Sequence, residues 1–253
     1  MFEFLLVFIY FCYFIELNKN INKMLKKLEL YKKFVGGIGK GYANSLIAVS
    51  RAGMGKTETT LVTLKELGYK EGKHYIYINS YITPLELYKQ LQRANDLDGP
   101  KILILDDCEE IFKNKITASL LKGALWHLPN GLRKVCWYST TSKVQNKSFY
   151  FEGKVILLLN SFNRNNPSIN AVADRGYYYE FNMTNGEILS LIKERAKRGR
   201  TGLSRGQKKR IVSFLSEYGS RSDRLSLRTL EQAYRLFLLS PNHWKELLKE
   251  LLK

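Results

Sequence analysis

The stretch that decides the fold reads Ser45-Leu-Ile-Ala-Val-Ser-Arg-Ala-Gly-Met-Gly-Lys-Thr57. Its first five residues predict a buried strand and its centre a glycine-rich turn, and a helix-like stretch begins at Glu58, directly after it. In such a loop, turn amides and the positive end of the helix dipole converge on phosphates, a lysine adds charge, and a threonine hydroxyl ligates Mg²⁺. We therefore predict that the chain binds ATP or GTP through Ser50, Arg51, Ala52, Gly53, Met54, Gly55, Lys56 and Thr57.

The loop departs from the usual pattern at one position. That pattern, G-x-x-x-x-G-K-[ST], opens with glycine, and Ser50 stands in its place. Gly53 and Gly55 keep the two positions nearest the phosphates. A serine restricts the backbone conformations of the turn more than glycine does, but it removes no amide donor. We therefore expect the loop still to bind phosphates.

Composition permits a large core and indicates an anionic partner. The chain has 253 residues, 45% of them hydrophobic, a formal net charge of +18 and a pI near 9.7. Such a charge attracts polyanions, with nucleic acid the first candidate and anionic membrane the second. The abundance of Lys, Asn, Ile, Tyr and Phe also suits an AT-rich genome. Part of the positive charge then has an alternative explanation, which is compositional drift rather than binding of a partner. The three cysteines have no metal-type spacing, which favours a reducing compartment and cytoplasmic localisation.

The N-terminus carries an apolar run over residues 4–15, followed by lysines. Twelve residues are short for a spanning helix, which needs about 20, and the flanks do not fit a signal peptide. A membrane anchor with a basic cytoplasmic flank stays open. We favour a soluble protein beginning at Met24, with residues 1–23 an over-extended reading of the start, so a membrane partner depends on whether 1–23 are real.

The middle of the chain alternates between strand-like and helix-like segments. Several strand-like segments are apolar throughout, as in a parallel sheet covered on both faces, and this predicts an α/β fold over residues 24–182. A hairpin or two short strands interrupt the alternation at 135–138 and 148–151. The other expected strands are 45–49, 73–79, 101–105, 155–159 and 176–181, and the expected helices are 58–67, 83–94 and 116–127.

From Met183 onward the pattern is helical alone. Thr184 and Glu187 have the spacing of a capping box, and further helices are expected from Ser204, from Leu225 and after Pro241. Residues 183–253 hold 16 Lys and Arg against seven Asp and Glu, a net charge of +9. We expect a small, basic, all-helical domain over 183–253.

Polar residues follow two of the apolar strands. Asp106 and Asp107 end one strand, and Asn160 ends another, at the edge where open α/β sheets bind ligands. Asp106 is expected to hold Mg²⁺ with Thr57, and Asp107 to orient or deprotonate the attacking water. Glu109 and Glu110 lie near enough to be alternative bases. Asn160 would contact the terminal phosphate and the attacking water, although Asn also ends strands because it favours turns.

The order of these motifs resembles that of the AAA+ ATPase family. Residues 50–57 are similar to its Walker A motif, Leu103-Ile-Leu-Asp-Asp107 to its Walker B motif, and Asn160 to its sensor 1. Ala171-Val-Ala-Asp-Arg175-Gly is similar to the box ending in an arginine finger, and Leu225-Ser-Leu-Arg228 to sensor 2. The resemblance covers about residues 40 to 240 and implies a P-loop NTPase core with a helical lid.

The resemblance also implies a mechanism. A Mg²⁺-dependent ATPase would bind ATP at a subunit boundary of a homo-oligomer, for which a hexameric ring is one form, with catalytic roles for Asp107, Asn160, Arg175 and Arg228. Two departures bear on it: the family usually has Glu in place of Asp107, and Asp174 is placed to pair with Arg175 and hold it back. An ordinary surface salt bridge stays open for Arg175, and Arg221 and Arg224 compete with Arg228.

DNA is the expected partner. A narrower likeness, in residues 120–125 and 149–160, to ATPases of bacteriophages and mobile elements implies work in DNA replication or recombination. A solvated helical face is the alternative for the basic cluster, and a nucleotide-regulated adaptor with little hydrolysis or a membrane-tethered ATPase are the alternatives for the whole chain. The DNA-binding candidates are Lys193, Arg195, Lys197, Arg198, Arg200, Arg205, Lys208, Lys209 and Arg210.

Overall fold

The computed structural model describes residues 26–139, 144, 146–163, 165, 167–198 and 202–253. The apolar run at 4–15 and the proposed start at Met24 lie outside them. The chain divides into two compact units. One holds residues 30–51 and 56–181, and the other holds 182–253 together with 26–29 and the loop residues 52–55. Within the described residues, no helix is both long and apolar enough to span a membrane.

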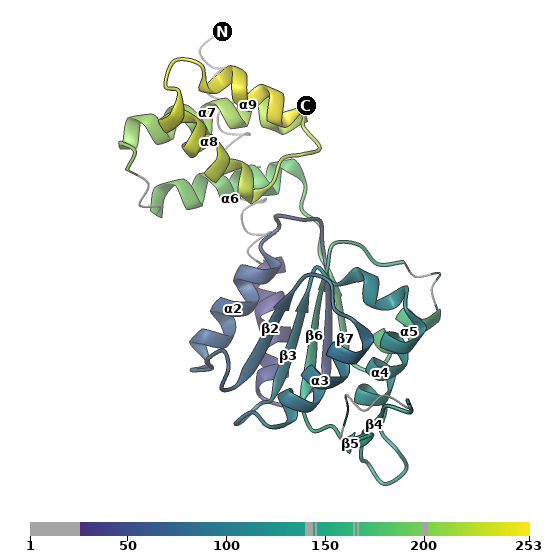
Figure 1. The fold of residues 1–253 in the computed structure, drawn as a ribbon. Coiled ribbons are helices and arrows are strands. Elements are labelled where there is room, and N and C mark those ends of the chain that lie inside the picture. Colours follow the sequence, from purple (N-terminus) through teal and green to yellow (C-terminus); the bar gives the residue numbers. More distant parts are fainter. Residues whose placement is uncertain (1–25, 140–143, 145, 164, 166, 199–201) are drawn as a thin grey trace, which may run out of the picture. The chain divides into compact units, whose positions relative to one another are not determined.

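The larger unit is built on a five-stranded parallel sheet in the order β2-β3-β6-β1-β7 (Figure 1). Every residue of β1 and β3 is buried, as is all of β6 after its first residue, so continuous apolar runs form these strands, as expected for a parallel sheet covered on both faces. The strand bounds are β1 Ser45–Val49, β2 Tyr75–Asn79, β3 Ile102–Asp106, β6 Lys154–Leu159 and β7 Tyr177–Glu180.

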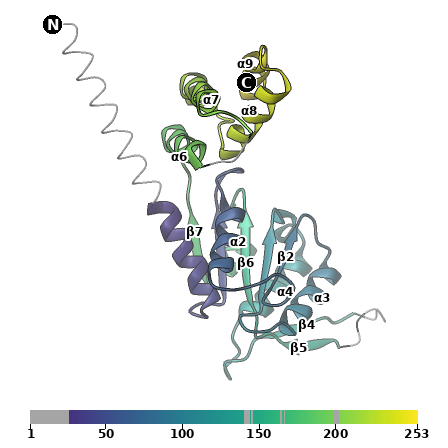
Figure 2. The ribbon, with the colours of Figure 1, turned by 90° about the vertical axis from the view of Figure 1, so that its left-hand side faces the viewer.

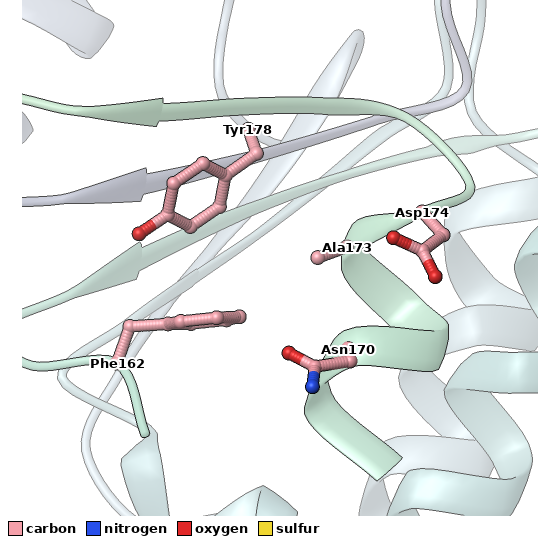
Figure 3. Close-up of a pocket in the computed structure, with 5 residues that line it drawn as sticks. All are labelled: Phe162, Asn170, Ala173, Asp174 and Tyr178. Atoms are coloured by element: carbon pink, nitrogen blue, oxygen red, sulfur yellow. The ribbon is translucent and has the colours of Figure 1, made fainter. Parts of the chain in front are cut away.

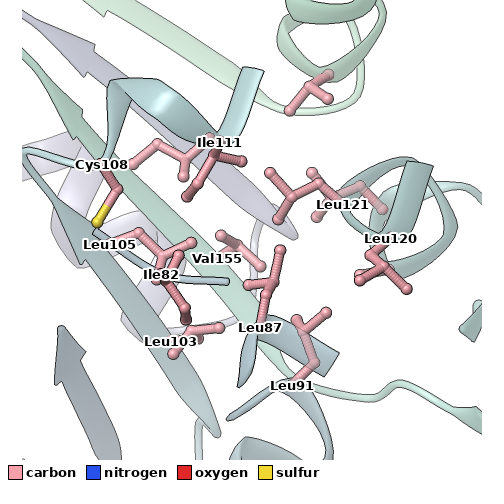
Figure 4. Close-up of a cluster of buried hydrophobic side chains, with 14 of the residues drawn as sticks. Ile82, Leu87, Leu91, Leu103, Leu105, Cys108, Ile111, Leu120, Leu121 and Val155 are labelled. Atoms are coloured by element: carbon pink, nitrogen blue, oxygen red, sulfur yellow. The ribbon is translucent and has the colours of Figure 1, made fainter. Parts of the chain in front are cut away.

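Three helices cover one face of this sheet, α3 (Pro84–Asn95), α4 (Lys115–Leu125) and α5 (Pro167–Ala173) (Figures 1 and 2). Their buried side chains meet the strands in one continuous core, in which Leu87 and Leu91 of α3 pack near Leu103 and Leu105 of β3 (Figure 4). Burying each such leucine contributes about 2 kcal/mol. This core holds β3 and β6 in place, and the residues that follow both strands are the candidate site residues.

The opposite face is covered by α2 (Lys56–Glu66) and by a helix described over residues 26–39 (Figure 2). Tyr31 of that helix is fully buried and stacks on Tyr179 of β7 with ring centroids 6.1 Å apart. Its hydroxyl also hydrogen-bonds to Thr60 Oγ1 of α2 at 2.5 Å. These contacts fix α2, and with it the helix end that carries Lys56 and Thr57.

A small antiparallel hairpin, β4 (Lys134–Cys136) and β5 (Ser148–Tyr150), stands between α4 and β6. Its expected position is confirmed. The Phe151 amide donates to the Arg133 carbonyl at 2.7 Å, and the Arg133 guanidinium lies 5.3 Å from the centroid of the Phe151 ring. The hairpin is thereby closed at its base.

The smaller unit is helical, as expected. Its helices are α6 (Asn185–Arg198), α7 (Arg205–Tyr218), α8 (Leu227–Leu239) and α9 (Trp244–Leu252), with a short 3₁₀ turn, η2, at Gly219–Arg221. The capping box before α6 is confirmed, because the Thr184 amide donates to Glu187 Oε2 at 2.8 Å and the Glu187 amide to Thr184 Oγ1 at 3.3 Å. Trp244 is buried between Phe214 and Phe237, with ring centroids 5.1 and 5.4 Å away.

Candidate nucleotide-binding site

The phosphate loop joins the end of β1 to the start of α2. The Ser50 amide continues the sheet by donating to the Leu159 carbonyl at 3.2 Å. Gly53 and Gly55 have φ values of +75° and +87°, a backbone conformation that side chains rarely adopt. The helix begins at Lys56, so its unpaired amides and positive dipole end face the loop. The local geometry is that of an anion-binding turn.

Lys56 is the buried cation of this loop. Only 5% of the residue is exposed, and its Nζ donates to the Ser50 carbonyl at 2.5 Å and to Asn160 Oδ1 at 3.1 Å. A longer contact of 3.3 Å reaches Ser50 Oγ, the hydroxyl that replaces the usual glycine. Lys56 therefore links the phosphate loop to the residue that follows β6.

Thr57 and Asp106, the two residues expected to hold the metal, are hydrogen-bonded to each other. Asp106 ends β3 and is 3% exposed, and Thr57 Oγ1 donates to its Oδ2 at 2.6 Å. The Tyr77 hydroxyl of β2 donates to the same oxygen at 2.8 Å. Both partners are neutral hydroxyls, and carboxylate and hydroxyl oxygens suit Mg²⁺.

The chemistry of this pair fits a magnesium ion held chiefly by phosphates. Among the described residues, no group of three or more His, Cys, Asp or Glu side chains is arranged to hold a metal. A complete protein cage is not needed, because Mg²⁺ is commonly bound by one or two protein ligands, substrate phosphates and water. Thr57 and Asp106 would supply the protein share.

Asp107 and Asn160 meet at the same edge of the sheet. Asn160 Nδ2 donates to Asp107 Oδ1 at 2.6 Å, while its Oδ1 accepts from Lys56. The amide orientation follows from the partners, because an ammonium only donates and a carboxylate only accepts. Asp107 is exposed, with φ +53°, so the chain turns sharply after β3 and presents this carboxylate to solvent.

Glu109, one of the two alternative bases, contacts the backbone of Asn160. It opens the 3₁₀ helix η1 (Glu109–Phe112), and its Oε1 accepts a hydrogen bond from the Asn160 amide at 2.7 Å. Glu109 thus anchors the backbone of Asn160, while Asp107 accepts from the Asn160 side chain.

Arg175 follows α5 and lies against an aromatic ring. Its guanidinium carbon is 4.7 Å from the centroid of Trp126, which is 55% exposed. Within the described part of the chain no ion pair joins Arg175 to Asp174, so the expected restraint is replaced by a cation–π contact, which contributes about 0.5–1 kcal/mol at exposed positions. Arg175 is not among the residues gathered at Lys56 and Asp106.

A shallow pocket of about 190 Å³ lies next to α5. Figure 3 shows aromatic rings from two segments on one side and the α5 residues on the other. It contains none of the predicted nucleotide or metal residues, so it is separate from the phosphate loop. Its lining residues are Phe162, Asn170, Ala173, Asp174 and Tyr178.

Arg228 lies at the start of α8 in the helical unit. In that unit, which includes the loop tip, the Leu227 amide donates to the Gly53 carbonyl at 3.1 Å. A Cβ on Gly53 would lie 2.8 Å from Ser226 Cβ and 3.6 Å from Arg228 Cγ. Glycine is therefore required at position 53 for space as well as for its φ, and Arg228 is the arginine beside the loop tip.

The expected DNA-binding residues fall on α6, α7 and the connection between them. Arg200 and the side chain of Arg198 lie outside the described residues. Lys197 pairs with Glu194 at 2.5 Å, and the Arg210 guanidinium lies 5.9 Å from the centroid of Phe237. The exposed members are Lys197, Arg205, Lys209 and Arg210.

Two residues that contact candidate site residues were not predicted from the sequence. Tyr77 reaches Asp106 from the neighbouring strand, and Trp126 lies under Arg175. Tyr77 precedes the end of β2 by two residues, beside a strand that ends in Asp106, and a sheet register would have indicated it. Trp126 follows the last residue of α4, and nothing in the sequence connects it to Arg175.

Comparison with known proteins identifies the fold. No family model and no curated protein matches the chain. Two solved structures of point mutants of Thermotoga maritima RuvB have TM-scores of 0.51 and 0.52 at 14% and 12% identity, covering 92% and 91% of this chain and 69% of theirs. A DNA replication initiation factor, at TM-score 0.49 and 16% identity over 88% of this chain and 63% of its own, is too weakly similar to argue from. The chain therefore has the fold of AAA+ P-loop ATPases, a parallel-sheet core with a C-terminal helical segment.

Proposed function

We propose that the chain is a Mg²⁺-dependent ATPase. The observation that carries the proposal is the pair of linked contacts at one edge of the sheet, Thr57 with Asp106 and Lys56 with Asn160. They place Lys56 for the phosphates, Thr57 and Asp106 for the metal, and Asn160 for hydrogen bonding at the carboxyl ends of adjacent strands. This is the edge at which α/β sheets bind ligands. No other arrangement of chemistry-bearing side chains in the described residues offers the same set.

Each residue then has one role in phosphoryl transfer. Loop amides and Lys56 would hold the outer phosphates, and Thr57 and Asp106 would hold the magnesium ion, which would supply positive charge next to them. Asp107 accepts the proton of the attacking water or orients it, and Asn160 places Asp107 by the hydrogen bond at 2.6 Å. Because catalysis of this reaction is chiefly positioning and charge stabilisation, these few groups suffice.

Arg175 and Arg228 complete the proposed site in two ways. Arg175 is away from the phosphate loop of its own chain and half-buried at the surface, which suits an arginine that acts on nucleotide bound by a neighbouring subunit of a homo-oligomer such as a ring. Arg228 is beside Gly53 of the loop tip, within the same unit, and we assign it contact with a nucleotide phosphate. Assembly would then switch hydrolysis on.

DNA is the proposed partner. The net charge of +9 over residues 183–253, with exposed cations on two helices of one unit, supports binding to phosphates without base specificity. Together with the narrower likeness to ATPases of bacteriophages and mobile elements, this favours a role in replication or recombination. Retention of single- or double-stranded DNA on filters should weaken steeply as salt rises, and no retention at low salt would end this part of the proposal.

A nucleotide-regulated adaptor is the second candidate. Asp107 is one methylene shorter than the glutamate usual in the family, and it is already engaged by Asn160. Both features favour slow hydrolysis. A single-turnover experiment with excess protein over ATP separates the two candidates, because an adaptor would bind the nucleotide and return it intact.

The main test is the ATPase rate of the full chain at several protein concentrations, with and without DNA. The proposal predicts Mg²⁺-dependent phosphate release whose rate per subunit rises with concentration and with DNA. A rate that is indistinguishable from the buffer at every concentration, with nucleotide bound, would favour the adaptor. Absence of nucleotide binding would overturn both.

A further inference from the structure

Tyr77 is the residue of the site that no nucleotide-binding motif includes. It lies in β2, which pairs in parallel with β3 so that Tyr77 is opposite Ile104 and Asn79 is opposite Asp106. From two positions back along the strand, its side chain reaches forward to the Asp106 carboxylate, and its hydroxyl donates to Oδ2 at 2.8 Å. The phenol is thus an additional partner for the proposed metal-binding carboxylate.

Tyr77 and Thr57 hold the same oxygen from different elements. The Thr57 hydroxyl, at the start of α2, donates to Asp106 Oδ2 at 2.6 Å. Two donors, Thr57 and Tyr77, occupy both lone pairs of Oδ2, so Oδ1 is the oxygen left for other partners. Rotation of the carboxylate about its Cβ–Cγ bond would break both hydrogen bonds at once. The buried carboxylate is therefore held in one orientation.

We propose that Tyr77 is a positioning residue for the nucleotide-bound Mg²⁺, acting through Asp106. The inference rests on the proposed function, because it assumes that Asp106 serves this metal. Residues that orient metal ligands by hydrogen bonds commonly alter metal affinity about 10- to 100-fold when they are removed. Tyr77 is the sole neutral donor from β2 to this oxygen among the described residues, so its loss leaves Thr57 to hold the carboxylate alone.

The test variant is Tyr77→Phe, and the matched control is Tyr75→Phe. Both lose one hydroxyl and keep the ring, and both residues lie on the same side of β2 because side chains alternate along a strand. The Tyr75 hydroxyl does not bond to the Asp106 carboxylate, whose described partners are Thr57 and Tyr77. Thermal melting without nucleotide shows whether the two variants are equally folded.

The experiment measures binding of a fluorescent ATP analogue by the full chain, in Mg²⁺ and in EDTA. Tyr77→Phe should leave the affinity in EDTA unchanged and lower the affinity in Mg²⁺ about tenfold. The Mg²⁺ concentration for half-maximal hydrolysis should rise by a similar factor, while the rate at saturating Mg²⁺ is retained. Tyr75→Phe should match the wild type in every measurement.

The outcomes separate the inference from the proposed function. A wild-type chain that binds no nucleotide, or binds it equally with and without Mg²⁺, contradicts the proposed function itself. A wild type that depends on Mg²⁺ together with a Tyr77→Phe variant of equal Mg²⁺ dependence overturns the inference and leaves the function standing. Equal losses of affinity in Mg²⁺ and in EDTA would assign Tyr77 a packing role and also overturn it.

Discussion

Asp107 offers the sharpest test of the proposed chemistry, because the structure makes two substitutions behave differently. The residue has φ +53°, which Asp and Asn tolerate better than other side chains that carry a Cβ. Asp107→Asn therefore keeps the turn and removes only the carboxylate. Asp107→Glu restores the acid usual in the family but places a less tolerant residue in the left-handed region, at a cost of about 1 kcal/mol.

The magnitudes follow from these two effects. Loss of a general base lowers turnover by about 10²- to 10⁴-fold, so Asp107→Asn should bind nucleotide as the wild type does and scarcely hydrolyse it. Asp107→Glu should melt roughly 2–4 °C lower, the shift expected for about 1 kcal/mol in a chain of this size. The added methylene also moves the carboxylate away from Asn160 Nδ2, which it now meets at 2.6 Å.

Single-turnover phosphate release and thermal melting check both variants. Wild-type turnover by Asp107→Asn would refute the assignment of Asp107 and turn attention to Glu109, whose carboxylate bonds to the Asn160 amide. Equal melting temperatures for Asp107→Glu and Asp107→Asn would refute the argument from backbone conformation.

Three further predictions use other contacts. Arg175→Ala and Lys56→Ala should each be inactive alone, and mixing them should restore some hydrolysis if Arg175 acts across a subunit boundary; activity of Arg175→Ala alone would contradict this. Ser50→Ala removes an acceptor 3.3 Å from Lys56 Nζ and should tighten nucleotide binding no more than about tenfold, as a titration can show; weaker binding would contradict the view that the hydroxyl only competes for Lys56. Burial alone would raise the pKa of Glu187, but hydrogen bonds from Lys27 and Thr184 outweigh it and hold that pKa below its ordinary value of 4.5, so its stabilising effect is present above that value and is lost as pH falls. Lys27→Met should therefore raise the pH midpoint of acid unfolding and lower stability by less than the roughly 3–5 kcal/mol seen for fully buried pairs, and an unchanged midpoint would contradict the assignment.

The sequence predicted the regular core because its signals are local. Apolar runs such as Val155–Leu159 and caps such as Thr184 with Glu187 specify an element within a few residues, and the structure has them close to the expected bounds. The helix over residues 26–39 and α5 (Pro167–Ala173) were not predicted. The first helix packs its aromatic residues Tyr31 and Phe34 on aromatic side chains of β7, a contact that the local sequence does not reveal. The second is seven residues long, too short to show a helical period.

The site residues that belong to a sequence motif could be predicted. Those that are brought together only by the pairing of strands or the packing of helices could not. Lys56, Thr57 and Asp106 follow from spacing and strand ends. Tyr77 depends on which strand lies beside β3, and the partner of Arg175 on how the end of α4 meets the end of α5. Both are long-range contacts between side chains, about which propensity and periodicity carry no information.

The proposed function requires that the loop around Lys56 and the end of the Asp106 strand together bind a metal–nucleotide complex. Calorimetric titration of the full chain with ATP, in Mg²⁺ and in EDTA, and of Lys56→Ala in Mg²⁺, tests it most directly. We expect saturable binding that Mg²⁺ strengthens and that Lys56→Ala abolishes. Binding that is the same in all three titrations, or no binding by the wild type, would contradict it.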